Sequence, residues 1–269
     1  MLGVEQELFR ISQGHLNLIE NCPRKFQHTC LDMLTTPPDP KQEEHKILGS
    51  RFHLLMQQQA MGLPVDSFIE EDERLKSLIL DLTGVIPEIL KPGNEGETFR
   101  ESEHSRNLQI GDYLITVIYD LLIANNEKAQ IFDWKTYRQP PDSKYIKSLA
   151  NHWQTKLYMY VLAETSTYLP KNISMTYWFI PGKGKSTKVE FRYSNVQHKK
   201  NENELKYILE KVSIWLEEYE KNQPLPQQPK HRKLCEYCPY SYRCYGEANY
   251  GGEKKFPRAN IQPIPEIEC

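Results

Sequence analysis

The sequence lacks any apolar run near the ~20 residues that a membrane-spanning helix needs, and its mean hydropathy is −0.67. Its first residues, MLGVEQELFRISQ, include acids and no long apolar segment, so they do not resemble a signal peptide. There is also little excess charge, because 34 Lys and Arg nearly balance 36 Asp and Glu, for a net charge of −2. We therefore expect a soluble, cytoplasmic protein without a membrane partner. Any contact with nucleic acid must come from local positive patches.

Two further absences narrow the function. No Gly-x-x-x-x-Gly-Lys-[Ser/Thr] loop occurs, so the chain contains no helicase motor of its own. Disulfides are not expected among its six cysteines if the protein is cytoplasmic, since thiols stay reduced there. Cys235, Cys238 and Cys244 instead lie close together near the C-terminus, which is typical of metal ligands.

Hydrophobic periodicity predicts an α/β protein with a mixed central sheet flanked by helices. The length of 269 residues is ample for a full hydrophobic core. We expect a single domain over residues 1–250, ending in a cysteine-rich appendage, with residues 251–269 as a flexible tail. The expected elements, in order, are helices over 12–30, 43–61 and 71–83, strands over 98–106, 109–124 and 129–136, a helix over 145–164, a hairpin of 174–181 with 187–193, and a helix over 201–221.

The segment Ile131-Phe132-Asp133-Trp134-Lys135-Thr136 combines charges with the character of a strand. Side chains alternate faces along a strand, so Asp133 and Lys135 point one way and Phe132 and Trp134 the other. A carboxylate and an ammonium on a mostly apolar strand are costly unless they meet a metal ion or a charged substrate. This segment is therefore a candidate catalytic site.

An upstream apolar strand, Leu114 to Ile123, contains one acid, Asp120. If the two strands form a hairpin, Asp120 lies beside Asp133. Two carboxylates and a lysine at one point could hold Mg²⁺ for phosphodiester cleavage. The alternative is a surface hairpin with an ordinary Asp/Lys pair. The apolar neighbours on both faces favour a cleft.

A remote cysteine completes a second pattern. Cys22, in Asn21-Cys22-Pro23-Arg24-Lys25-Phe26, joins Cys235-x2-Cys238-x5-Cys244 to make four candidate thiolates. Together with the Asp/Lys strand, this arrangement resembles the RecB-like, Cas4-like branch of the PD-(D/E)XK nuclease superfamily, which has a restriction-endonuclease-like core and an iron–sulfur cluster. The resemblance covers the chain from about Ile11 to Gly246.

The resemblance implies further site residues. His53, at the end of Gly49-Ser50-Arg51-Phe52-His53, would bind Mg²⁺ or Mn²⁺ with Asp120, Asp133 and the backbone carbonyl of Trp134. An early glutamate, Glu101 or alternatively Glu103, would join them. Gln154 and Tyr158, four residues apart on one helix face, would position Lys135 and the DNA.

The four cysteines would hold a [4Fe–4S] cluster, for which four thiolates are the usual number. Zinc is the alternative, because four-cysteine zinc sites are common. Such a centre, formed by Cys22, Cys235, Cys238 and Cys244, would join the N-terminal helix to the C-terminal segment.

The function expected from this resemblance is that of a metal-dependent DNA exonuclease acting on single-stranded ends in repair, recombination or CRISPR adaptation. A separate helicase or CRISPR adaptation proteins would be its partners. Trp153 and Tyr158 are candidates for stacking on bases. The alternatives are a nucleic-acid-binding module with the nuclease fold and little cleavage, and a zinc-stabilised scaffold protein.

Overall fold

The computed structural model describes residues 8–36, 40–70, 72–85, 98–136, 142–182, 184–229 and 233–246. Its helices are α1 (Gln13–Asn21), α2 (Pro23–Phe26), the π-helical segment η1 (Gln27–Leu31), α3 (Pro40–Ala60), α4 (Asp66–Glu70), α5 (Glu73–Thr83), α6 (Ser143–Leu149), α7 (Trp153–Glu164), α8 (Asn195–Glu220) and α9 (Ser241–Tyr245), with short 3₁₀ turns at Pro170–Asn172 and Lys233–Cys235. The strands are β1 (Phe9–Ile11), β2 (Phe99–Ile110), β3 (Tyr113–Ala124), β4 (Ala129–Lys135), β5 (Ile173–Phe179) and β6 (Thr187–Arg192). The tail at 251–269 lies outside the described residues.

The six strands form one mixed sheet around β3. β2 pairs antiparallel along one edge of β3, while β1 and β4 share the other edge, at opposite ends of that strand. β4 pairs parallel with β5, and β5 pairs antiparallel with β6. The expected α/β fold with a mixed sheet is confirmed.

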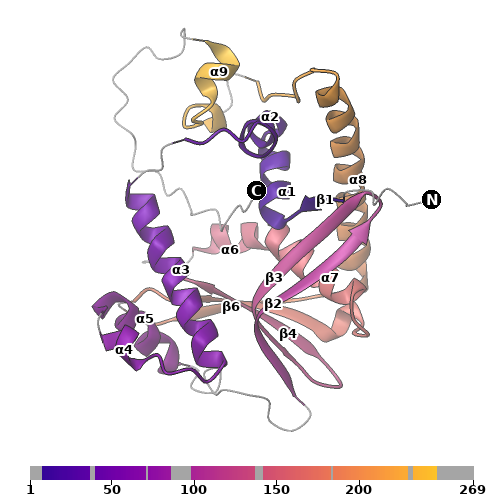
Figure 1. Cartoon of the computed structure of the whole chain (residues 1–269). Coiled ribbons are helices and arrows are strands. Elements are labelled where there is room, and N and C mark those ends of the chain that lie inside the picture. The colour runs from indigo at the N-terminus through magenta and orange to yellow at the C-terminus, as the bar shows by residue number, and fades with distance from the viewer. Residues whose placement is uncertain are drawn as a thin grey trace, which may run out of the picture.

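Helices cover both faces of this sheet (Figure 1). α3 and α5 bury one face together with Leu121, Trp134 and Trp178. α1, α7 and α8 bury the other, against Ile115, Met175 and other strand residues. None of the helices in the described part of the chain has the length and apolar character needed to cross a bilayer.

Several expected elements are divided in the structure. The helix predicted over 12–30 is interrupted at Cys22, which is extended (φ −165°, ψ 105°), and Pro23 opens α2 at a position where its missing N–H costs nothing. The helix predicted over 145–164 is two helices, because His152 is extended at the start of α7. β1 and α4 had no sequence prediction, since each is only three to five residues long.

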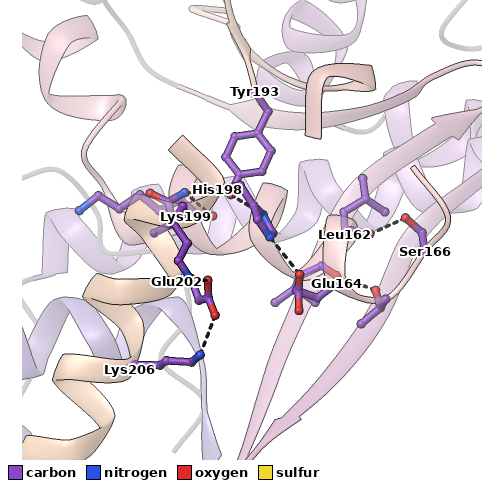
Figure 2. Close-up of polar contacts among 12 residues, drawn as sticks. Leu162, Glu164, Ser166, Tyr193, His198, Lys199, Glu202 and Lys206 are labelled. Carbon is purple, nitrogen blue, oxygen red and sulfur yellow. Dashed lines mark hydrogen bonds and ion pairs between the residues drawn. The ribbon is translucent and has the colours of Figure 1, made fainter. Parts of the chain in front are cut away.

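A polar cluster fixes α8 against the end of α7 (Figure 2). His198 Nε2 lies 3.0 Å from a Glu164 carboxylate oxygen, and His198 Nδ1 lies 3.2 Å from the Tyr193 hydroxyl. The ring of Tyr160 stacks on the imidazole at 5.0 Å between centroids. These contacts hold α7, which carries Gln154 and Tyr158, in a defined position on the sheet.

Candidate active site

Along β3 the side chains alternate between the two faces of the sheet, and at Asp120 this alternation shifts by one residue. From Tyr113 to Tyr119 the odd-numbered side chains enter the core beneath α7, whereas beyond Asp120 that core receives Leu122 and the opposite core receives Leu121. Such irregularities re-aim side chains and are common next to active sites. The slip places the carboxylate of Asp120 at the boundary between the two cores.

The neighbouring strand is irregular at the same point. Glu103, opposite Asp120 on β2, has φ +52° and lies between Ser102 and His104, which pair with Leu121 and Tyr119 of β3. A non-glycine residue in this left-handed region is uncommon, and such strain is concentrated at functional sites. The irregularity thus occurs in both strands where they meet.

Glu103, Asp120 and His53 form a group of potential metal ligands. One side-chain donor atom from each lies within 4.8 Å of those of the other two. His53 Nδ1 lies 3.3 Å from an Asp120 oxygen, and His53 Nε2 lies 3.1 Å from the backbone oxygen of Trp134. Carboxylate, carbonyl and imidazole donors suit a hard divalent ion with some preference for Mn²⁺. The residues present fit such an ion.

Glu101 lies apart from this group. Its carboxylate contacts His104 Nδ1 at 2.8 Å, and its side chain is half exposed. Of the two glutamates considered from the sequence, the structure brings Glu103 to Asp120 and directs Glu101 elsewhere.

Asp133 and Lys135 lie beside the ligand group on β4. Lys135 Nζ contacts one Asp133 oxygen at 2.6 Å, and Gln154 Nε2 donates to the other, also at 2.6 Å. Lys135 also donates to Gln154 Oε1 at 3.2 Å, so the three side chains close a ring of contacts. Burial raises the pKa of the neighbouring Tyr158 hydroxyl, and Gln154 opposes this shift. Gln154 therefore orients both the acid and the lysine.

The end of the β3–β4 pairing brings the two acids together. The ladder ends at Leu121 opposite Phe132, one residue before Asp120 and Asp133. There the Asp120 side chain accepts a hydrogen bond of 2.7 Å from the backbone N–H of Trp134. Asp120 thus bridges the strands where their backbone pairing stops.

The buried charges shift one another's pKa values. Burial raises the pKa of Asp133 to about 6, against the opposing effect of Lys135. Burial acts in the same direction on Asp120, but His53 and Lys135 hold its pKa below the usual value. Burial alone would lower the pKa of His53, but the negative charges of Asp120 and Asp133 outweigh this effect and raise the pKa to about 9. Two carboxylates are thus balanced by an imidazolium and an ammonium, and a divalent ion could replace the proton on His53.

The stacking role expected for Trp153 and Tyr158 is wrong. Trp153 is 1% exposed and Tyr158 is 7% exposed, because α7 packs these side chains into the core. Neither ring is available to a DNA base.

Four cysteines line a small hollow at the other end of the molecule. α9 lies beside α2 there (Figure 1), which brings Cys22 together with Cys235, Cys238 and Cys244. Burial raises the pKa of the Cys238 and Cys244 thiols, and the neighbouring cysteines add to it, while Lys25 and Arg24 oppose it. Four sulfurs with two nearby cations fit a thiolate-bound metal or cluster.

Several direct contacts also join the two ends of the chain here. Arg24 Nε donates to the Leu225 carbonyl at 2.7 Å, and the Tyr240 hydroxyl donates to the Leu34 carbonyl at 2.7 Å. The Gln228 side chain donates to the Asn21 carbonyl at 2.7 Å. The cysteines are therefore not the sole link between the N-terminal helices and the C-terminal segment.

A matched pair of substitutions tests which glutamate serves the site. Glu103→Gln should weaken Mn²⁺ binding about tenfold or more, since it removes one anionic ligand. Glu101→Gln, two residues away on the same strand, should leave binding within about twofold. Isothermal titration with Mn²⁺ measures both. Equal losses, or a greater loss from Glu101→Gln, would contradict the assignment of Glu103.

The chain is similar to known proteins in sequence and in fold. Residues 10–245 match a family model described as the PD-(D/E)XK nuclease superfamily. A crystal structure of a protein from Eubacterium rectale described as a "putative exonuclease" has a TM-score of 0.56 at 8% identity, covering 86% of this chain and 87% of that one. The structure of the protein SSO0001 matches at TM-score 0.36 and 16% identity, over 91% of this chain and 90% of that one. No curated protein matches the sequence.

Proposed function

This chain belongs to the PD-(D/E)XK nuclease superfamily, and we propose that it is a metal-dependent DNA exonuclease of the RecB-like, Cas4-like branch. The nuclease fold itself implies hydrolysis of phosphodiester bonds with a divalent metal. The observation that carries the proposal is the convergence of the half-buried His53 and Glu103 on the buried Asp120, beside the Asp133–Lys135–Gln154 ring. Structural side chains alone have little reason to gather these charges in the interior.

Each residue has a distinct role in this proposal. Mg²⁺ or Mn²⁺, held by His53, Glu103, Asp120 and the Trp134 carbonyl, would lower the pKa of water and neutralise phosphate charge. Asp133 borders this group and would be a further ligand of the ion. Lys135 then orients the attacking water and stabilises the charge that develops on the phosphate.

Gln154 and Tyr158 act as positioning residues. Gln154 holds the Lys135 ammonium and the Asp133 carboxylate at once, and Tyr158 lies one helical turn further along the same face of α7. Preorganised donors of this kind cost no reorganisation during the reaction.

We further propose that Cys22, Cys235, Cys238 and Cys244 bind a [4Fe–4S] cluster that stabilises the fold, with zinc as the alternative. Support comes from the four thiols around one hollow and the cations beside them. In this proposal residues 1–250 make up a single domain. Single-stranded DNA ends are the proposed substrate, in repair, recombination or CRISPR adaptation, with a helicase or adaptation complex as partner.

A cleavage assay tests the proposed activity. Protein purified without oxygen should shorten end-labelled single strands in Mn²⁺, leave circular single strands intact, and do nothing in EDTA. Double strands with blunt ends should be poorer substrates. Tight DNA binding without metal-dependent cleavage would instead support the binding-module alternative.

A further inference from the structure

His28 is a buried histidine that lines the cysteine hollow and has no role in the proposed active site. It lies on η1, six residues after Cys22, and is 7% exposed. It borders the hollow together with the four cysteines and Tyr240, whose ring lies 5.2 Å from the imidazole between centroids. The hollow is therefore lined by an imidazole as well as by thiols.

Asp32 fixes which nitrogen of this imidazole is available. His28 Nδ1 lies 2.8 Å from one Asp32 oxygen. The Tyr219 hydroxyl donates to the other Asp32 oxygen at 2.8 Å, and Gln27 Nε2 donates at 3.3 Å to the oxygen that His28 contacts. An ionised carboxylate can only accept, so Nδ1 carries the hydrogen and a neutral ring has its lone pair on Nε2.

Nε2 of His28 is buried and has no hydrogen-bond partner among the described residues. A buried polar atom left unpaired is costly, so each case calls for an explanation. A histidine whose other ring nitrogen donates to a carboxylate is the recurring arrangement of metal-binding histidines. His28 combines three features: it lines the hollow, its Nδ1 contacts a carboxylate, and its buried Nε2 has no partner among the described residues.

We propose that His28 is a reserve metal ligand of the cysteine hollow: oriented by Asp32, its Nε2 binds iron or zinc in place of a missing thiolate. This inference rests on the proposed metal site at the cysteines. A [4Fe–4S] cluster or a zinc ion needs four protein ligands, and imidazole suits both metals. The hollow then holds one donor more than the metal requires, so it can keep its metal when one thiolate is missing.

The test compares single cysteine variants with and without the imidazole. Cys22→Ser, Cys235→Ser, Cys238→Ser and Cys244→Ser are each made alone and with His28→Phe, which keeps an aromatic ring beside Tyr240. The full-length chain is purified without oxygen. Iron and zinc per chain, and the rate of metal release to a chelator, are measured together with circular dichroism to establish folding.

At least one single cysteine variant should retain most of its metal and release it at least about tenfold more slowly than its His28→Phe double variant. If the metal is an iron–sulfur cluster, pulsed EPR of that variant should show strong nitrogen coupling that His28→Phe removes. Asp32→Asn, a milder change, should speed metal release only when His28 is present.

His15→Phe is the matched control. His15 is also a buried histidine, 6% exposed, with an unpaired Nε2, but it packs on Phe26 and does not line the hollow. Its replacement should leave metal release unchanged. Equal metal loss from all cysteine variants with or without His28 would overturn the inference while leaving the cysteine site intact. A wild-type chain without iron or zinc would remove the cysteine site itself, and this inference with it.

Discussion

Asp120→Asn should lower the rate of DNA cleavage at least about a hundredfold, the usual cost of removing one group that stabilises transition-state charge. Asparagine keeps the size of the side chain and can still accept the hydrogen bond from the Trp134 N–H. The loss of activity would therefore come from the missing negative charge of a metal ligand beside His53 and Glu103, and not from a disturbed fold. Initial rates on an end-labelled single strand in saturating Mn²⁺ measure the effect.

Asp142→Asn is the control for this substitution. Asp142 caps α6 by accepting from the Tyr145 N–H at 2.7 Å, and asparagine caps helices equally well. Its activity should equal that of the wild type. If Asp120→Asn retained activity within about twofold of this control, Asp120 would not be a ligand of the catalytic metal.

Lys135→Met should abolish cleavage and also destabilise the protein. The ammonium lies between two buried acids, and its contact with Asp133 measures 2.6 Å. Removing one partner of a buried ion pair typically costs about 3–5 kcal/mol, because the remaining charge is left uncompensated. Urea unfolding measures the loss of free energy of unfolding.

Divalent metal should restore part of the stability lost in Lys135→Met. Mn²⁺ supplies positive charge to the carboxylates that the lysine no longer balances, so it should raise the unfolding midpoint more in this variant than in the wild type. Lys156→Met is the matched control, since its ammonium is equally buried, pairs with Glu204 at 2.9 Å and lies over Trp153. This control should lose stability, keep activity and gain nothing extra from Mn²⁺. An identical response of the two variants would place Lys135 outside the metal site.

The sequence predicted the parts of the site that follow regular geometry. The two-residue period of a strand places Asp133 and Lys135 on one face, and their side chains are in contact. The hairpin prediction placed Asp120 near Asp133, and the strands pair in the register that brings them together. The α/β fold was predictable for the same reason, since apolar periodicity reflects burial directly.

The irregular parts could not be predicted in this way. In a strand with a strict period of two, Glu101 and Glu103 lie on the same face, so the sequence cannot tell which one is the metal ligand. Only the left-handed backbone conformation at Glu103 distinguishes the two positions. Glutamate is not among the residues whose presence signals such a conformation. The slip at Asp120 depends on how two helical layers pack on the sheet, which is a tertiary effect. His28 gave no signal, because its partner Asp32 lies one helical turn away in an ordinary-looking segment.

The contacts between the two ends of the chain have a consequence for how the protein is made. Arg24 meets Leu225 across 201 positions, and Tyr240 meets Leu34 across 206. Contacts so distant in sequence slow folding, because the intervening chain must be ordered before they can form. During translation, α1 and α2 leave the ribosome before Leu225 and Tyr240 have been made, so these partners do not yet exist. Until then their apolar side chains, including Leu16 and Phe26, remain open to association with other nascent chains.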